Sequence, residues 1–75
     1  MKLPVVSGKE MIKFLQSKGF SIARQKGSHV SLYKKTSEGN LIVVVPIKKA
    51  IKPGTLLSIL KQSKTIRKEL IEHLR

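Results

Sequence analysis

Apolar residues recur at helical spacing near the start of the chain, directly after a pair of residues that favours a helix start. Ser7 and Glu10 are spaced as a capping box, in which each side chain accepts a hydrogen bond from the other residue's amide. The apolar face that follows consists of Met11, Ile12, Phe14 and Leu15. Lys18 falls in the last turn, and Gly19 readily takes the left-handed conformation that ends a helix. The pattern predicts a first helix over residues 8–18.

Strand-like segments follow this helix and are separated by short polar connections. Residues 20–25 alternate apolar and polar side chains, residues 29–34 do so again, and residues 41–45 are all apolar. Residues 26–28 and 35–40 hold glycines and polar side chains that are typical of turns. Because the connections are short, we expect the three strands to form an antiparallel meander. The third strand is expected to be the best buried.

A second helical pattern fills the C-terminal part of the chain. Pro53-Gly54 marks its start, because proline is favoured in a first helical turn, and the apolar stripe consists of Leu56, Leu57, Ile59 and Leu60. Residues 63–65 interrupt the helix, and Thr65 is expected to cap a short terminal helix. The predicted order is α-β-β-β-α with a short C-terminal helix, an α+β fold. In so short a chain the helices must cover one face of the sheet, which leaves the other face open to solvent or to a partner.

Length and composition limit the architecture and the location of the protein. A chain of 75 residues is enough for a single domain over 1–75. It has no cysteine, so neither a disulfide nor a cysteine–zinc site braces the thin core. The N-terminal residues lack the apolar run of a signal peptide, and the longest apolar run is too short to span a bilayer. We expect a cytoplasmic protein without membrane contact.

The charge balance adds a class of partner to this picture. Sixteen lysines and arginines stand against four acidic residues, which gives a net charge of +12. Such a surface attracts a polyanion, either a nucleic acid or an acidic protein. Thirteen of the sixteen cations are lysines, which suit phosphate attraction better than bidentate recognition of bases. The few aromatic residues do not make a broad base-stacking platform.

Candidate chemistry lies at His29, the first residue of the second predicted strand. Histidine as a residue type titrates near neutral pH and serves as a general acid or base. A lone histidine in a basic domain is more often a plain strand residue, and Gly27-Ser28 before it can serve only as a turn. Alternatively, Gly27 lets a phosphate approach the backbone and Ser28 hydrogen-bonds that phosphate. His73, in the terminal helix, is interpreted as a surface residue.

Four lysines flank this histidine in sequence or lie in the basic loop before the second helix: Lys26, Lys48, Lys49 and Lys52. They form either an ordinary solvated face or a phosphate clamp. The helix start at Pro53 favours the clamp, because a helix N-terminus attracts anions. The four carboxylates are scattered along the chain, so the sequence predicts no metal site and no cofactor, and a two-metal nuclease is disfavoured.

Several blocks of the sequence resemble the HicA toxins, small messenger-RNA interferases of toxin–antitoxin pairs. The blocks are Ser7 to Glu10, Arg24 to His29, Val45-Pro46 and Lys52 to Gln62, and the resemblance covers nearly the whole chain. It implies a double-stranded-RNA-binding-domain-like α-β-β-β-α fold with helices on one face of the sheet. It also implies ribonuclease activity with His29 as the catalytic group, and a HicB-type antitoxin that binds and blocks the toxin. The chain departs from the pattern at Lys48, near which many relatives carry a further histidine.

Together these features predict the toxin of a type II toxin–antitoxin pair, acting as a metal-independent mRNA endoribonuclease. In this hypothesis His29 is the general acid or base and the lysines bind phosphate. Lys26, Lys48 and Tyr33 are the candidates for protonating the leaving oxygen. DNA lacks the 2′-hydroxyl that this chemistry needs, and we expect no direct DNA binding by the toxin alone.

Two alternatives remain open from the sequence. The first is a catalytically silent RNA-binding module of the same fold, which grips RNA through its shape, phosphates and 2′-hydroxyls. The second is an adaptor that binds only an acidic protein partner. RNA binding without cleavage identifies the module, and the absence of any RNA affinity identifies the adaptor.

Overall fold

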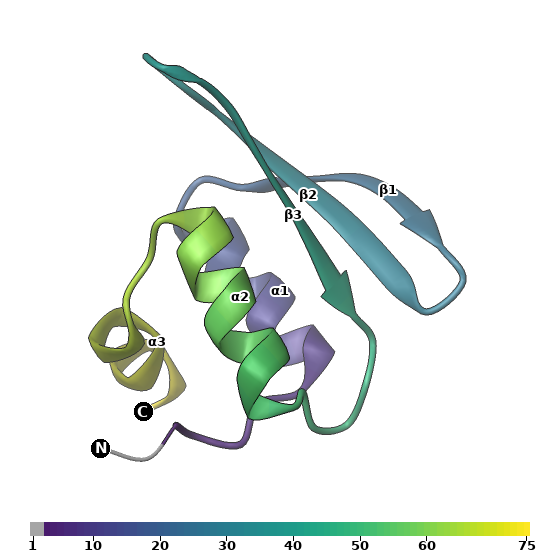
Figure 1. The fold of residues 1–75 in the computed structure, drawn as a ribbon, viewed down its shortest axis with the longest axis vertical. Helices are drawn as coiled ribbons and strands as arrows, with labels where there is room; N and C mark the ends of the chain where they lie inside the picture. The colour runs from purple at the N-terminus through teal and green to yellow at the C-terminus, as the bar shows by residue number, and fades with distance from the viewer. Residues whose placement is uncertain (1–2) are drawn as a thin grey trace.

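The computed structural model describes residues 3–75, which form a three-stranded sheet and helices that all lie on one side of it (Figure 1). The elements are α1 Gly8–Ser17, β1 Ser21–Lys26, β2 His29–Thr36, β3 Gly39–Pro46, α2 Pro53–Ser63 and α3 Arg67–Leu74. The predicted α+β fold, with an α-β-β-β-α order and a short terminal helix, is confirmed. Within residues 3–75 no helix is long and apolar enough to cross a membrane.

Helix α1 begins where the sequence predicts, at a capping box. The Glu10 amide donates to the Oγ of Ser7 at 3.1 Å, and the Ser7 amide donates to the Oε1 of Glu10 at 3.0 Å. These bonds satisfy two amides that the start of a helix leaves without helical partners. The helix ends at Ser17, and Gly19 follows with a φ of 96°. This positive φ is the left-handed stop expected of the glycine.

The sheet is an antiparallel meander in the order β1-β2-β3, as predicted. The central strand β2 pairs with β3 along its whole length, from His29 opposite Pro46 to Thr36 opposite Gly39. The edge strand β1 pairs with β2 apart from one irregularity between Ile22 and Arg24, and all of its residues are exposed. The sheet therefore rests on the helices mainly through β2 and β3.

The β2–β3 hairpin is tighter than expected. Most of the polar residues 35–40, expected to form a loop, continue the two strands, and the turn consists of Ser37 and Glu38. Gly39 takes a φ of 123°, and the Thr36 hydroxyl donates to the Gly39 carbonyl at 2.6 Å. The loop expectation is wrong because this end of the hairpin has no buried face. Strand residues without a buried face carry the same polar side chains as a loop.

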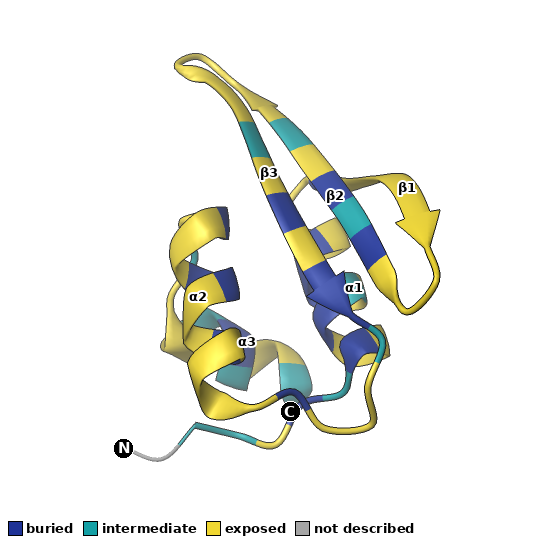
Figure 2. Ribbon diagram, turned by 45° about the vertical axis from the view of Figure 1, so that its right-hand side comes forward, coloured by how far each residue is buried: buried dark blue, intermediate teal, exposed yellow. Residues whose placement is uncertain are grey.

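Alternate residues of β2 and β3 face the helices and form the core with them (Figure 2). In β2 these are Val30 and Leu32, which lie opposite Val45 and Val43 of β3. The rest of the core consists of Val6, Met11, Phe14, Leu15, Phe20, Ile51, Leu56, Ile59, Leu60 and Leu70. β3 contains the most buried positions of the three strands, as expected, but only near its C-terminal end. Ile42 and Val44 lie on the open face of the sheet, while Leu41 is partly buried and packs against the core.

The turn between α2 and α3 differs from the prediction in its cap. Ile66, not Thr65, is the N-cap residue of α3. The Thr65 hydroxyl lies 2.7 Å from the Ser63 hydroxyl, so it is engaged with the end of α2. The Ile66 amide donates to the Oε1 of Glu69 at 3.2 Å instead. Sequence spacing alone favours a threonine cap, but its hydroxyl bonds within the turn.

Candidate functional site

The β1–β2 turn, the end of β3 and the loop after β3 meet at one end of the sheet. The strand register places Lys26 opposite His29 on one side and Pro46 opposite His29 on the other. One step further, the Ile47 amide donates to the Ser28 carbonyl at 2.6 Å. The candidate catalytic block and the start of the candidate basic loop, separated in sequence, therefore adjoin in space.

His29 combines a fixed backbone with an exposed side chain. It is the first residue of β2, and the next residue, Val30, faces the core. Because side chains alternate along a strand, His29 lies on the open face together with Ser31 and Tyr33. Its Nδ1 is 3.5 Å from the Oγ of Ser28. The imidazole is therefore held by a paired strand while it remains accessible to a ligand from solvent.

Gly27 gives the turn before His29 its shape. Its φ is 59°, in the left-handed region that L-residues with side chains rarely adopt. No atom lies within 4 Å of the position that a Cβ would occupy. The glycine is thus required by the backbone conformation and not by crowding, and it leaves the main chain of the turn open to a phosphate.

Main-chain hydrogen bonds from the N-terminal part of the protein hold the loop after β3. The Gly8 amide donates to the Lys48 carbonyl at 2.8 Å, and the Ile51 amide donates to the Val6 carbonyl at 2.8 Å. Ile51 is buried, which anchors the far end of the loop in the core. The loop that carries the lysines is therefore a defined structure rather than a free connection.

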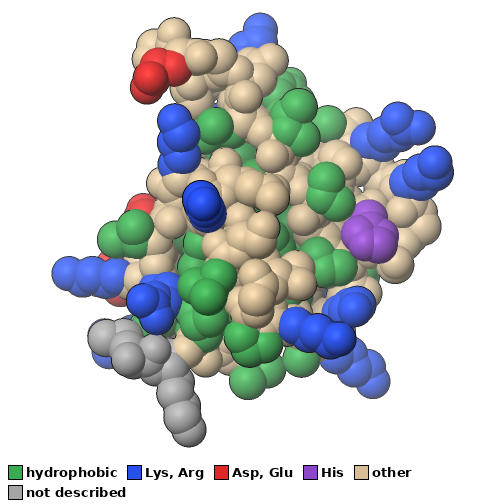
Figure 3. Space-filling view, in the orientation of Figure 1, with side chains coloured by type: hydrophobic (Ala, Val, Ile, Leu, Met, Phe, Trp, Pro, Cys, Tyr) green, Lys and Arg blue, Asp and Glu red, His purple; other side chains and the backbone are tan. Residues whose placement is uncertain are grey.

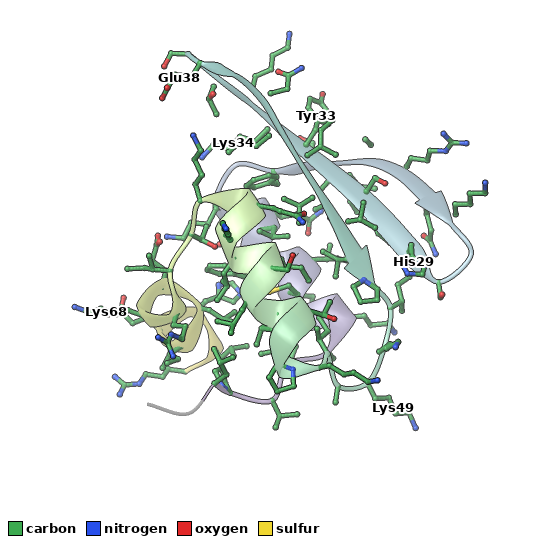
Figure 4. The ribbon with its side chains drawn as sticks, in the orientation of Figure 1. His29, Tyr33, Lys34, Glu38, Lys49 and Lys68 are labelled. Carbon is green, nitrogen blue, oxygen red and sulfur yellow. The ribbon has the colours of Figure 1, made fainter. Side chains whose placement is uncertain are left out.

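The candidate phosphate-binding residues divide between these two segments. Lys26, Gly27 and Ser28 belong to the turn beside His29, while Lys48, Lys49 and Lys52 belong to the loop, and all six are exposed. Lys52 is the N-cap residue of α2, so it stands at the end of the loop furthest from β3. Figure 4 shows Lys49 and His29 on the same side of the molecule. Lys48 therefore lies next to Ile47, which is hydrogen-bonded to the β1–β2 turn, whereas Lys52 lies at the start of α2.

A small hollow next to the loop adds a residue that sequence reasoning missed. It has a volume of about 230 Å³ and is lined by Ser7, Lys9, Ile47, Lys48 and Lys49. Lys9 reaches this group because α1 starts beside the loop. The sequence gives no signal for this, because Lys9 stands there only as an exposed residue between Gly8 and Glu10 in the first turn of a helix. Three lysines lining one hollow make it a suitable place for a phosphate group.

The carboxylates described by the structure have other roles. Hydrogen bonds from the backbone and then the side chain of Ser7 hold the pKa of Glu10 below its ordinary value. Glu38 lies at the hairpin tip (Figure 4), and Glu69 forms an ion pair with Lys18. On the face drawn in Figure 3, a histidine side chain lies between lysine and arginine side chains. Among residues 3–75 no three His, Cys, Asp or Glu side chains come close enough together to hold a metal ion.

Comparison with known families matches a family model to the sequence that forms this end of the sheet. A family model described as HicA toxin of bacterial toxin-antitoxin matches residues 8–65. The matched segment runs from α1 through the sheet and the loop of residues 47–52, here called the lysine loop, to the end of α2. It stops just before α3. It includes all of the candidate site residues described above, but not Val6 and Ser7, which contact the site from the N-terminal side. Comparison with curated proteins gives no match.

Proposed function

The chain belongs to the HicA toxin family, and we propose that it exerts its toxin role as a messenger-RNA endoribonuclease in the cytoplasm. One observation supports this most directly: an exposed imidazole sits on a paired strand end, next to a glycine turn and a lysine-bearing loop. A general base must be accessible to its substrate and held in one place. His29 meets both conditions.

The proposed reaction is a transesterification within RNA. His29 accepts the proton of a ribose 2′-hydroxyl, and the 2′-oxygen attacks the adjacent phosphorus. The bond from phosphorus to the 5′-oxygen breaks, and that oxygen takes a proton from Lys26 or Lys48 as it leaves. The products are a 2′,3′-cyclic phosphate and a 5′-hydroxyl. Because the nucleophile is the ribose itself, the reaction is restricted to RNA.

The cations at the end of the sheet stabilise the charge that grows on the phosphorane oxygens. Lys26 lies opposite His29 in the sheet, and Lys48 follows the residue bonded to the β1–β2 turn. In this proposal either lysine donates to a phosphate held at Gly27. Tyr33 is four residues further along β2, about 13 Å away at the rise of a strand. It is therefore poorly placed to protonate the leaving oxygen.

The partner that restrains the toxin is, in this proposal, a HicB-type antitoxin that covers His29. The open face of the sheet next to His29 is suited to a protein surface. Tyr33, Ile42 and Val44 lie on that face and are 39%, 65% and 45% exposed. An antitoxin with an acidic, partly apolar surface would bury these side chains and exclude RNA from the lysines.

The decisive experiment is cleavage of labelled messenger RNA in excess EDTA. We expect cutting by the wild-type protein and a loss of about 100- to 10,000-fold for His29→Ala, the range typical of a general base. His73→Ala is the matched control, since it removes the other histidine, on α3, and should retain full activity. A strict need for Mg²⁺ or full activity of His29→Ala contradicts the proposal. RNA binding without any cleavage makes the protein a silent RNA-binding module.

A further inference from the structure

A second surface, separate from the one around His29, lies between α2 and α3. The two helices enclose a groove of about 820 Å³. Its apolar lining consists of Leu57, Leu60, Ile66 and Ile71. Leu57 and Ile66 are 46% and 58% exposed, so a substantial apolar area faces solvent here. One wall of the groove, α3, begins after the segment that matches the family.

The groove is preformed, because α3 is fastened to the body of the protein through its other side. Leu70 is fully buried in the core, and Glu69 forms an ion pair with Lys18 at 2.6 Å. The ring of His73 packs edge-to-face on Phe14 of α1, with centroids 5.5 Å apart. With α3 held on α1, the groove between α2 and α3 does not close by a simple shift of the helix.

Positive charge surrounds the apolar lining. Lys61, Lys68 and Arg75 stand along the groove, and within residues 3–75 their side chains have no ion-pair partner. Arg67 also lines the groove, although it already has a contact of its own. Glu72 is the one acidic residue of the lining. An apolar groove with a cationic rim is complementary to a ridge of apolar side chains flanked by carboxylates.

We propose that this groove binds an acidic amphipathic helix of a partner protein. Such a helix presents apolar side chains at i, i+3 or i+4 and i+7 along one face, with glutamates beside them. The apolar ridge covers Leu57 and Ile66, and the glutamates meet Lys61 and Lys68. Apolar burial and ion pairs then both stabilise the same complex.

Other occupants fit this surface less well. A second copy of the chain brings another +12 of charge and would set the same lysines against each other. RNA gains little from aliphatic side chains, and no aromatic residue lines the groove for base stacking. A membrane surface is flat, whereas this site is concave. A helix of opposite charge is the ligand that matches both the shape and the rim.

The groove is remote from the candidate catalytic residue. Figure 4 shows Lys68 and His29 on opposite sides of the molecule. A partner bound between α2 and α3 therefore leaves the end of the sheet uncovered. The inference goes beyond the proposed ribonuclease function and stands or falls separately from it.

The test uses a fluorescently labelled synthetic helix, about four turns long, with leucines at i, i+4, i+7 and i+11 and glutamates flanking them. We expect binding to the wild-type protein with a Kd below about 100 μM, weakened by salt. Leu57→Glu should weaken binding at least tenfold, while Ile42→Glu, the same kind of change on the open sheet face, should not. Lys68→Glu should weaken binding several-fold, while Lys35→Glu on β2 should not. Thermal unfolding of each variant checks that it folds.

The alternative outcomes are separable. No binding at millimolar peptide overturns the proposal, as does binding that Ile42→Glu and Leu57→Glu weaken equally. A third outcome is a wild-type protein that does not bind the peptide but self-associates or binds vesicles of anionic lipid. If Leu57→Glu abolishes that association, the groove has another occupant and the proposal is overturned. RNA cleavage by Leu57→Glu should equal that of the wild type. Loss of cleavage in His29→Ala with peptide binding intact would separate the two surfaces.

Discussion

Gly8, the first residue of α1, packs directly against the carbonyl oxygen of Pro46, where β3 ends. A Cβ on Gly8 would also lie 2.8 Å from the Cα of Ile47, closer than real Cβ contacts allow. The Gly8 amide meanwhile donates to the Lys48 carbonyl at 2.8 Å. This close approach joins the start of the first helix to the lysine loop, and it explains why a glycine stands in a capping box.

The first prediction follows from this contact. Alanine normally stabilises a helix relative to glycine by about 0.5–1 kcal/mol. At Gly8 the sign reverses, because the added methyl meets backbone atoms, and we expect Gly8→Ala to destabilise the protein by about 1–3 kcal/mol. Urea unfolding followed by circular dichroism measures the change in the free energy of unfolding.

Gly54 provides the matched control for this measurement. It lies in the first turn of α2, and no atom comes within 4 Å of the position that an added methyl group would occupy. Gly54→Ala should be neutral or stabilising by up to about 1 kcal/mol. Equal destabilisation by both changes would mean that the contact between Gly8 and Pro46 is not what fixes the start of α1.

The second prediction concerns the path of RNA over the protein. Each phosphate neutralised on a single strand adds about 0.7 to the slope of log affinity against log salt. Replacing Lys48, Lys49 and Lys52 together by alanine should flatten the slope by about 2. Fluorescence anisotropy with a short single-stranded RNA at several salt concentrations measures it, with an inactive His29→Ala background to prevent cutting.

The control for the loop lysines must remove the same charge elsewhere. Lys13, Lys61 and Lys68 are exposed residues of the three helices, outside the loop and the β1–β2 turn. Their replacement by alanine lowers the net charge equally but should change the slope by less than half as much. If both triple variants flatten the slope to the same extent, the lysine loop is not the main RNA contact.

The sequence predicts the helices and strands well, but it predicts the contacts between segments that are distant in the chain less well. The capping box of α1 and the left-handed Gly19 are local features, determined by residues close together in the chain. The position of His29 at the start of β2 follows from the glycine turn before it. The hydrogen bond between Ile47 and Ser28 depends instead on the register of β2 and β3. The sequence does not predict how far these two strands pair, because the residues near the hairpin tip are as polar as those of a loop.

The role of Lys9 also could not be predicted from the sequence. Its place in the sequence indicates only an exposed residue in the first turn of a helix. It joins Lys48 and Lys49 around one hollow because Gly8 lets α1 begin against the end of β3. That contact joins segments that are far apart in the chain, and no local pattern of charge or hydropathy reports it.

The third prediction is a pH dependence of stability at α3. The side-chain hydrogen bond from Lys18, followed by the bond from the Ile66 amide, holds the pKa of Glu69 below its ordinary value. A carboxyl group whose pKa is lower in the folded state stabilises the fold above its unfolded pKa, which is about 4.3 for glutamate. This stabilisation is lost as the pH falls through the lowered pKa of the folded protein.

Glu69→Gln isolates that contribution. We expect the variant to melt at a lower temperature than the wild type at pH 7, and the difference to shrink as the solution is acidified below pH 4. Glu38→Gln, at the hairpin tip, is the control and should show little difference at either pH. A difference between Glu69→Gln and wild type that stays constant down to pH 2 would show that the ion pair with Lys18 is not responsible.

The fourth prediction tests the surface proposed for the antitoxin. Ile42 is 65% exposed on the open face, so Ile42→Glu should fold normally while placing a charge where a partner's apolar surface would lie. Co-expression with the neighbouring open reading frame should yield a complex with the wild type and a weaker one with this variant. We expect cell growth to be rescued for the wild type but only partly for Ile42→Glu.

RNA cleavage by purified Ile42→Glu is the necessary companion measurement, and it should remain within about twofold of the wild type. Val5→Glu serves as the control for the complex, since Val5 is 81% exposed and lies in the segment before α1, outside the sheet. If the partner binds Ile42→Glu and the wild type equally, the antitoxin does not rest on the open face of the sheet.

Three main-chain hydrogen bonds fasten the loop between β3 and α2: the Ile47 amide donates to Ser28, the Gly8 amide to Lys48 and the Ile51 amide to Val6. None of these attachments uses the side chain of a lysine, so the scaffold does not depend on which residues occupy positions 48, 49 and 52. A lysine there is interchangeable, as far as folding is concerned, with a histidine or a neutral residue. If these lysines bind RNA as proposed, substitutions at positions 48, 49 and 52 would change RNA binding while the framework stays intact.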